Sequence, residues 1–174
     1  ACTKNNIRTN QNQASDVETD VDYHTYTVDG KEYSYNSHLM NFLITGVDTR
    51  DGEGGQSDFV LLLSFDRQNR QYRLLQLDRS AYIEIRMFDF EHNFLGWEKS
   101  YLALSYAYGT NTKQSTLYTK DAVSRLLHQI PITYYMTLSL DHLSLIQDVT
   151  GPIEVEVKDD QLAAANPEWT KGSI

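Results

Sequence analysis

The sequence predicts an α/β fold in which helices sandwich a mixed central sheet, preceded by a short N-terminal hairpin. Three observations predict this fold. A hairpin signal comes first, strand-like apolar runs follow it, and helical and strand patterns alternate in the second half of the chain. The 174 residues are 40% hydrophobic, which is enough for one core but not for two independent domains. We therefore expect residues 21–174 to form a single domain.

The start of the chain differs from the rest in composition. Residues 3–20 are almost wholly polar and rich in Asn, Gln, Thr and Asp. Such a segment buries too little apolar surface to offset the entropy that it would lose on ordering. We expect residues 1–20 to form a flexible tether that holds the domain off a surface.

Cys2 is the single cysteine, which excludes a disulfide or a Cys-based zinc site within the chain. A cysteine at the start of a polar segment is typical of a bacterial lipoprotein after its signal has been cut, and the alternative is a free thiol. No apolar run approaches the ~20 residues of a membrane-spanning helix. We therefore expect any membrane anchor to be a lipid on Cys2 or a segment upstream of it.

The N-terminal half predicts a hairpin and a meander of strands. Asp29-Gly30, between the alternating runs Tyr23–Val28 and Glu32–Tyr35, is a type I′ hairpin signal. Longer strands are expected at Asn41–Val47, Phe59–Phe65 and Tyr72–Leu77. A short polar turn joins the second and third of them, so these should be antiparallel neighbours. Their near-continuous apolar character predicts a sheet covered on both faces.

The middle of the chain predicts one more strand and two helices. We expect a strand at Ala81–Ile85, a loop or small hairpin over Met87–Glu98, and helices over Ser100–Tyr108 and Ser115–His128. The second helix carries its apolar residues near helical spacing, which indicates a stripe that faces the core. Ile130-Pro131 should end it.

The last third predicts a strand, a helix and a strand. Tyr134–Leu138 has the composition of a strand. Asp141 is expected to cap a short helix over Leu143–Val149, and Gly151 to end it. Ile153–Val157 alternates between apolar and polar residues, as a final strand would.

The charge of the chain argues against nucleic acid as a partner. The formal net charge is -9, and no run of Lys or Arg exceeds two residues. A nucleic-acid-binding domain needs a basic patch that faces the phosphates. We expect no nucleic acid partner.

Strand direction brings three charged residues to one end of the predicted sheet. The first long strand ends at Asp48, the second begins at Asp58 and the third ends at Arg79. In an antiparallel meander these positions share one end of the sheet. Two carboxylates with hydroxyl groups nearby suit Mg²⁺, which takes one or two carboxylates and completes its shell with water and phosphate oxygens.

Arginines and glycines complete a candidate diphosphate site. Arg50 and Arg79 supply planar donors for phosphate oxygens. The glycines between Asp51 and Gln56 let the backbone approach a bulky anion. The alternative is that residues 49–57 form only a flexible polar loop, in which Asp and Gly are common. Residue types alone favour that alternative.

Five short sequence motifs follow one another between about Asn41 and the end of the chain. They are Gly46-Val47-Asp48-Thr49-Arg50, Gln56-Ser57-Asp58, Arg79-Ser80, Ser105-Tyr106-Ala107-Tyr108-Gly109, and a last group with Ile130-Pro131-Ile132 and Gly151-Pro152-Ile153. Each segment is a weak signal alone, but the five together are specific. They resemble the LytR-CpsA-Psr family of bacterial envelope proteins.

The resemblance implies an enzyme at the extracellular face of the cytoplasmic membrane of a Gram-positive bacterium. It implies transfer of a glycopolymer, such as teichoic acid, from a polyprenyl diphosphate lipid to peptidoglycan with Mg²⁺ as cofactor. Asp48 and Asp58 would hold the metal. Arg50, Arg79 and Gln56 would bind the diphosphate, while Arg79 and Asp58 would be catalytic. The lipid tail would lie between the sheet and a helix layer.

Some positions depart from the family pattern. Gln56 stands where many members have Arg, as in a clostridial-like branch, and Ser80 stands where many have Asp. Tyr101 and Ala103 stand where Lys and Asn are common. The family also continues past residues 171–174 into a helix with further arginines, so the domain is expected to lack its C-terminal part. These losses support an alternative function, in which the protein binds a polyprenyl phosphate or a wall polymer without catalysis.

Overall fold

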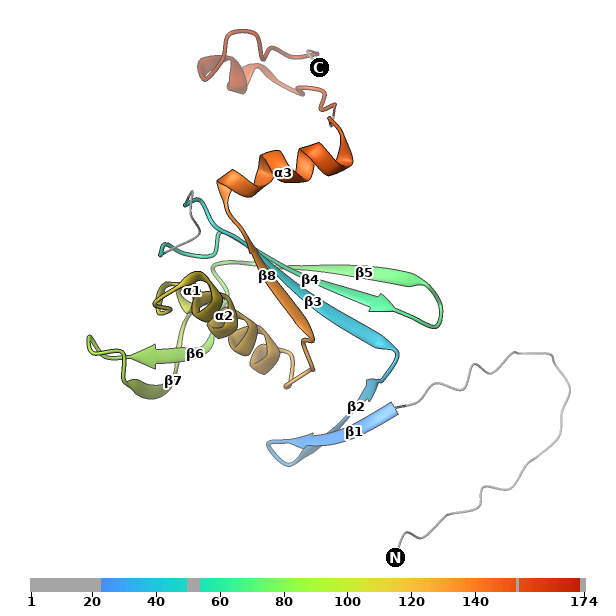
Figure 1. Ribbon diagram of the computed structural model, residues 1–174, viewed down its shortest axis with the longest axis vertical. Coiled ribbons are helices and arrows are strands. Elements are labelled where there is room, and N and C mark those ends of the chain that lie inside the picture. Colours follow the sequence, from blue (N-terminus) through green and yellow to red (C-terminus); the bar gives the residue numbers. More distant parts are fainter. Residues whose placement is uncertain (1–22, 50–53, 153, 173–174) are drawn as a thin grey trace, which may run out of the picture.

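A computed structural model describes residues 23–49, 54–152 and 154–172 of the protein. The chain has a mixed α/β fold around a four-stranded sheet, with a two-stranded hairpin before it and a second two-stranded sheet beside it (Figure 1). The predicted fold class is therefore confirmed. No helix in the described part of the chain is long and apolar enough to cross a membrane. The predicted tether and Cys2 lie outside the described residues.

The N-terminal hairpin forms where the turn signal predicts it. β1 (Tyr23–Val28) and β2 (Lys31–Asn36) pair antiparallel. Asp29 and Gly30 have φ values of 49° and 75°. A type I′ turn needs positive φ at both central residues, which suits Asp-Gly. The hairpin lies beside the start of the first long strand, at the far end of the sheet from the candidate site (Figure 1).

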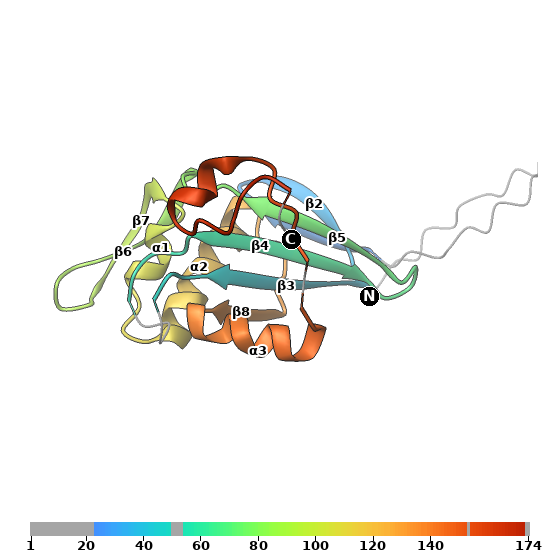
Figure 2. The same cartoon turned by 90° about the horizontal axis from the view of Figure 1, so that it is seen from above.

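The central sheet is mixed and has the strand order β5-β4-β3-β8 (Figure 2). Its strands are β3 (Leu39–Gly46), β4 (Phe59–Asp66), β5 (Gln71–Leu77) and β8 (Tyr134–Leu138). β3, β4 and β5 form an antiparallel meander, which confirms the predicted pairing, whereas β8 pairs parallel with β3. A parallel neighbour requires a long crossover, and here the crossover contains the second sheet and two helices.

The longest helix, α2 (Thr112–Leu126), packs against β8 and against β6 (Tyr82–Phe88). Asn111 caps it, and its side chain accepts a hydrogen bond from the Gln114 backbone N–H at 3.0 Å. The helix starts before the predicted Ser115 because this cap satisfies a free N–H group of the first turn. Residues of α2 join a core made of Leu43, Val60, Leu62, Ile83, Ile85, Leu102, Ala122 and Val123.

The second sheet corrects one predicted helix. β6 and β7 (Phe94–Tyr101) form a hairpin, which is one of the two alternatives predicted for Met87–Glu98. The predicted helix over Ser100–Tyr108 is largely wrong, because β7 continues to Tyr101 and α1 covers only Leu104–Ala107. Tyr101 pairs with Tyr82. This pairing with the preceding strand of the hairpin overrides the local helical pattern.

The next helix, α3 (Leu140–Thr150), begins earlier than predicted. Its N-cap is Ser139 and not Asp141, which lies in the first turn. The Ser139 backbone N–H donates to His142 Nδ1 at 3.1 Å, as in a capping box with histidine in place of the usual acid. Gly151, with φ 80°, ends the helix as predicted.

The predicted final strand over Ile153–Val157 is wrong. Residues 154–157 form no strand, and the one regular element after α3 in the described residues is a short 3-10 helix at Asp160–Ala164. An alternating pattern becomes a strand only when a neighbour supplies hydrogen bonds. No described strand pairs with this segment.

The two faces of the central sheet are covered unequally. Leu43 on β3 is fully buried on the side of α2, and Phe42 therefore points to the opposite face, because side chains alternate along a strand. α3 packs beside β8, but Tyr72 and Leu74 on β5 are 68% and 59% exposed. The prediction that both faces are covered thus fails at β5 in the described residues.

Candidate functional site

The candidate site lies at the end of the central sheet where β3 ends and β4 begins. The register pairs the last residue of β3 with the first of β4, and the last residue of β5 with Val60 on β4. The segments beyond these strand ends therefore meet. Asp48, Asp58 and Arg79 lie on these segments, within two residues of the strand ends.

The side chains of Asp58 and Gln56 both bind the Arg79 guanidinium. Its Nη1 donates to the Asp58 carboxylate in an ion pair, and its Nη2 donates to Gln56 Oε1 at 2.9 Å. The Asp58 and Arg79 side chains are 35% and 44% exposed, so a ligand can reach them. A guanidinium has five N–H donors in one plane, and these two bonds leave donors for phosphate oxygens.

The backbone of Ala103 ties together the segments that carry this pair. The Ala103 N–H donates to the Arg79 carbonyl at 3.0 Å, and the Ser57 N–H donates to the Ala103 carbonyl at 3.2 Å. Ala103 and Ser57 are both buried. Because these bonds are made by backbone atoms, a side-chain substitution at Gln56 should leave both segments in place.

Gly55 brings the loop before β4 close to the end of β3. Its φ is +77°, and a Cβ added there would lie 3.1 Å from Thr49 Cγ2 and 3.8 Å from Asp48 Oδ1. Glycine adopts this conformation without the steric cost that other residues meet. The residue therefore lets the loop backbone pass beside Asp48.

The oxygen atoms at this end of the sheet suit a hard cation. Asp48 and Asp58 line one cavity, and the buried hydroxyl oxygens of Thr49 and Ser57 have no hydrogen-bond partner in the described chain. No group of three or more His, Cys, Asp or Glu within the described ranges could enclose a metal. This donor set fits Mg²⁺, which binds one or two carboxylates and keeps water or phosphate oxygens in its other positions.

Two cavities of different polarity adjoin the Asp58–Arg79 pair. On the side of Asp58, a mainly apolar cavity of about 350 Å³ is lined by Gly46, Val47, Asp48, Asp58, Phe59, Leu138, Ser139, Leu140 and Leu143. On the side of Arg79, a mainly polar cavity of about 260 Å³ is lined by Gln56, Arg79, Ser80, Tyr101, Ala103 and Leu104. A phosphate bound at the pair would therefore have apolar surface on one side and polar groups on the other.

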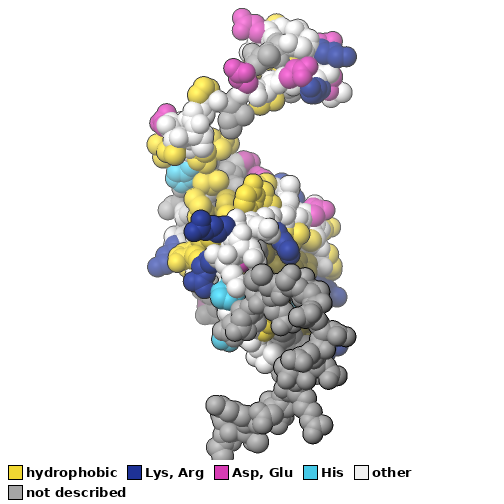
Figure 3. All heavy atoms as spheres, turned by 90° about the vertical axis from the view of Figure 1, so that its right-hand side faces the viewer, with side chains coloured by type: hydrophobic (Ala, Val, Ile, Leu, Met, Phe, Trp, Pro, Cys, Tyr) yellow, Lys and Arg dark blue, Asp and Glu magenta, His cyan; other side chains and the backbone are white. Residues whose placement is uncertain are grey.

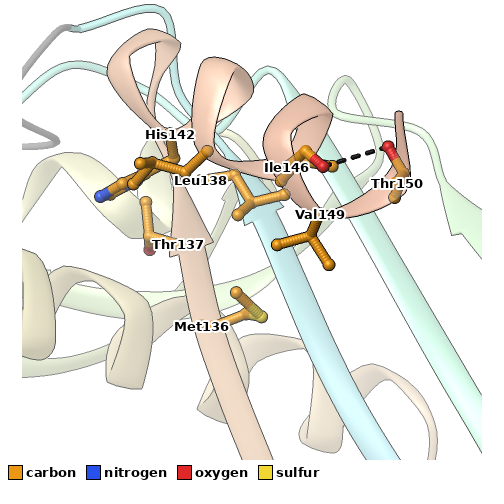
Figure 4. Close-up of a pocket in the computed structure, with 8 residues that line it drawn as sticks. Met136, Thr137, Leu138, His142, Ile146, Val149 and Thr150 are labelled. Atoms are coloured by element: carbon orange, nitrogen blue, oxygen red, sulfur yellow. Dashed lines mark hydrogen bonds between the residues drawn. The ribbon is translucent and has the colours of Figure 1, made fainter. Parts of the chain in front are cut away.

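A third cavity extends the apolar surface between β8 and α3. Its volume is about 380 Å³, and Met136, Leu138, Ile146 and Val149 are among the residues that line it (Figure 4). Leu138 also lines the apolar cavity at Asp58, so the two are neighbours. Hydrophobic side chains gather where α3 meets the sheet (Figure 3).

The structure does not describe every predicted site residue. Arg50 and the loop residues 51–53 lie outside the described part of the chain. Asp48, Gln56, Asp58 and Arg79 lie together, while their roles toward metal and diphosphate stay predictions. Sequence analysis named Tyr101 and Ala103 only as departures from the family pattern, and it did not predict the hydrogen bonds that the Ala103 backbone makes. The apolar spacing of Leu140 and Leu143 on α3 is the one signal that could have indicated the cavity beside Asp58.

Curated relatives cover most of this chain. A Bacillus cereus protein named polyisoprenyl-teichoic acid–peptidoglycan teichoic acid transferase TagU is 26% identical over 138 residues, which is 79% of this chain and 40% of that protein. The Bacillus licheniformis protein of the same name is 24% identical over 124 residues, covering 69% of this chain and 35% of its own length. The chain thus spans well under half the length of these relatives.

Solved structures share the fold. A Streptococcus agalactiae protein superposes with a TM-score of 0.57 at 24% identity, covering 78% of this chain and 47% of its own. Bacillus subtilis TagV superposes with a TM-score of 0.53 at 22% identity, covering 72% and 45%. The model of the LytR_cpsA_psr family matches residues 3–172. Because that match covers nearly the whole sequence, the chain belongs to the LytR-CpsA-Psr family.

Proposed function

We propose that the protein is an extracytoplasmic transferase that moves a glycopolymer from a polyprenyl diphosphate lipid to peptidoglycan. The observation that carries this proposal is the placement of the Asp58–Arg79 pair between an apolar and a polar cavity. A lipid-linked diphosphate has the same order of apolar, anionic and polar parts. The names of the TagU relatives support the same reaction class.

Arg79 and Asp58 have distinct roles in this proposal. Arg79 donates hydrogen bonds to the phosphate oxygens and stabilises the charge that develops during transfer, while Asp58 and Gln56 hold its guanidinium plane in place. An acceptor hydroxyl forms a bond to the phosphorus that carries the glycopolymer. The bond from that phosphorus to the oxygen of the lipid phosphate breaks, polyprenyl phosphate leaves, and the hydroxyl proton passes to solvent.

Mg²⁺ is the cofactor we propose for this site. Asp48 and Asp58 would hold it, with the unpartnered hydroxyls of Thr49 and Ser57 close by. When bound, the ion neutralises phosphate charge. Arg50 would add a second guanidinium for the diphosphate. The lipid would follow the apolar cavities along Leu138 toward α3.

The location follows from this function, because both the lipid-linked donor and peptidoglycan lie outside the cytoplasmic membrane. We propose that the protein is tethered to that membrane by residues 1–20, through a lipid on Cys2 or an upstream segment. Gln56 further suggests a clostridial-like branch of the family.

A specific observation favours a second function, which is binding without turnover. The polar cavity has no charged side chain besides Arg79 among the described residues that line it, and Arg79 is already paired with Asp58. A protein of this kind would bind the polyprenyl phosphate or a wall polymer in the envelope and transfer nothing.

Transfer by the complete natural protein separates these functions. A fluorescent glycan on a short-chain polyprenyl diphosphate would be incubated with peptidoglycan fragments and Mg²⁺. Arg79→Ala should lower transfer about 100-fold or more, as expected for loss of a donor to the transition state. Glu98→Ala, an exposed substitution on β7, should leave transfer unchanged. Binding of the donor with no transfer by the natural protein would establish the second function instead.

A further inference from the structure

The end of the β6–β7 hairpin exposes hydrophobic side chains that the candidate site does not use. Phe90 in the turn is fully exposed, and Phe94 and Leu95 at the start of β7 are 49% and 66% exposed. We call these three residues the hairpin tip. The hairpin projects beyond the end of the central sheet that carries the candidate site (Figure 2). Apolar side chains that gather on such a projection mark a contact with another molecule or with a membrane.

The turn itself does not require an exposed ring. The Asp89 carboxylate accepts hydrogen bonds from two backbone N–H groups and from the Asn93 amide. Asp66 accepts a similar set of three bonds in the turn between β4 and β5. Arg67 follows Asp66, whereas Phe90 follows Asp89. Because a similar turn forms around a charged residue at this place, Phe90 is exposed for a reason other than folding.

Ring contacts fix the base of the hairpin. Phe88 stacks on Tyr118 of α2 with ring centroids 4.8 Å apart, and the Phe94 ring lies 5.7 Å from Phe88. The Arg86 guanidinium lies 5.1 Å from the centroid of the Trp97 ring. These contacts join both strands to each other and to the helix, so the hairpin tip is held out in solvent.

We infer that the hairpin tip inserts into the outer surface of the lipid bilayer, an inference that rests on the proposed function. That function places the protein at the membrane. A protein partner fits this tip less well, because one aromatic side chain buries ~150–250 Å² and three side chains fall short of the ~800 Å² that each partner buries in a stable interface. A bilayer sets no such minimum, since its binding strength simply grows with the apolar area inserted.

The contact is hydrophobic and not electrostatic. Residues 88–97 contain no Lys or Arg, and Asp89 and Glu91 flank Phe90. Attraction to anionic headgroups through basic residues is therefore absent from this segment. Salt should not weaken the insertion, because screening acts on charges and not on apolar burial.

Insertion would also orient the candidate site. The hairpin lies on the side of the molecule where β3 ends and β4 begins (Figures 1 and 2). A protein held at the hairpin tip would turn the Asp58–Arg79 pair toward the bilayer that contains the lipid-linked donor.

Tryptophan quenching tests the insertion in the complete natural protein. Phe90→Trp would be reconstituted into vesicles of brominated phosphatidylcholine, in which bromine on the acyl chains quenches an inserted indole. The substitution adds emission to that of the unsubstituted protein, and about half or more of this added emission should be lost. Gln68→Trp is the matched control, because it places the same ring on the similar turn between β4 and β5. Its added emission should be unchanged.

Three results would overturn the inference. They are equal quenching in both variants, no quenching in Phe90→Trp, and quenching that disappears in high salt. A blue shift without quenching in Phe90→Trp would mean that a protein covers the hairpin tip instead of lipid.

Phe90→Ser distinguishes this inference from the proposed function. The variant should lower transfer about threefold or more from a long-chain donor embedded in vesicles, because less apolar area inserts. Transfer from a short-chain donor in solution should be unchanged. If the natural protein transfers from neither donor while Phe90→Trp is still quenched, the proposed function fails and the insertion stands.

Discussion

Arg79 Nη2 donates a hydrogen bond to Gln56 Oε1 at 2.9 Å, while the neighbouring Nη1 is paired with Asp58. Each Nη of the guanidinium thus has its own acceptor, so the plane can neither rotate nor withdraw without breaking a bond. Gln56 in this geometry orients Arg79, in addition to any contact that it makes with a substrate.

The Gln56–Arg79 bond predicts a coupled effect on transfer. Gln56→Ala should lower transfer about 3- to 10-fold, because it removes one neutral hydrogen bond that orients the guanidinium. In an Arg79→Lys background the same change should have little effect, because lysine has no second planar nitrogen for Gln56. A double-mutant cycle measures this coupling, and Gln76→Ala on exposed β5 is the control. Equal losses in both backgrounds would contradict the orienting role.

Substitution by alanine should affect transfer differently at the two glycines before β4, Gly54 and Gly55. Gly54 and Gly55 both have positive φ, but only at Gly55 would a new Cβ meet another atom, Thr49 Cγ2 at 3.1 Å. Each alanine variant should lose about 1–2 kcal/mol of stability from the left-handed backbone. Gly55→Ala should also lower transfer about tenfold more than Gly54→Ala, because it shifts the loop beside Asp48. Similar transfer rates would show that the close approach is not needed.

The core predicts a large difference between two leucine substitutions. Leu43 on β3 is fully buried, whereas Leu95 on β7 is 66% exposed. Leu43→Ala should destabilise the fold by about 2–5 kcal/mol through lost burial and a cavity, and Leu95→Ala by about 0.5 kcal/mol or less. Urea unfolding of each variant measures the difference. A small effect at Leu43 would mean that this face of the sheet is not the core.

Hydrogen bonds in the turn between β6 and β7 predict a lowered pKa for Asp89. Hydrogen bonds from the Asn93 side chain, and then from its backbone, lower the pKa of Asp89 below its ordinary value of 3.8. The ionised group therefore stabilises the fold above pH 3.8, and this contribution is lost as pH falls through the lower folded pKa.

Substitution of the donor tests this cause. Asn93→Ala should move the pKa of Asp89 upward, as measured by NMR titration of its carboxyl group. Asn69→Ala is the matched control, because it removes the same kind of bond from Asp66 in the other turn. An Asp89 pKa that rises in the control, or stays in place in Asn93→Ala, would contradict the assignment.

Local signals account for the parts of the fold that were predicted correctly. Asp29-Gly30 specifies its turn without help from the rest of the chain, and the short polar turn after β4 leaves only antiparallel pairing. The helix expected over Ser100–Tyr108 fails for the opposite reason. Its first residues pair with β6, the preceding strand of a hairpin, and the residues of this segment alone do not show that a strand partner is present.

The candidate site, like the fold, could be predicted from the sequence only in part. Chain direction alone placed Asp48, Asp58 and Arg79 at one end of the sheet, since strand ends depend only on the order of strands. The contact of Gln56 with Arg79 and the lining of the polar cavity could not be predicted. Both depend on Ala103, which reaches the site because β7 returns beside β6.

The uncovered strand β5 has a practical consequence. Its outer edge pairs with no described strand, and its aromatic and aliphatic side chains face outward. The unpaired backbone N–H and C=O groups of this edge lie beside exposed hydrophobic side chains. A strand of another molecule can pair with such an edge. We therefore expect the protein to form sheet-linked oligomers at high concentration through this edge.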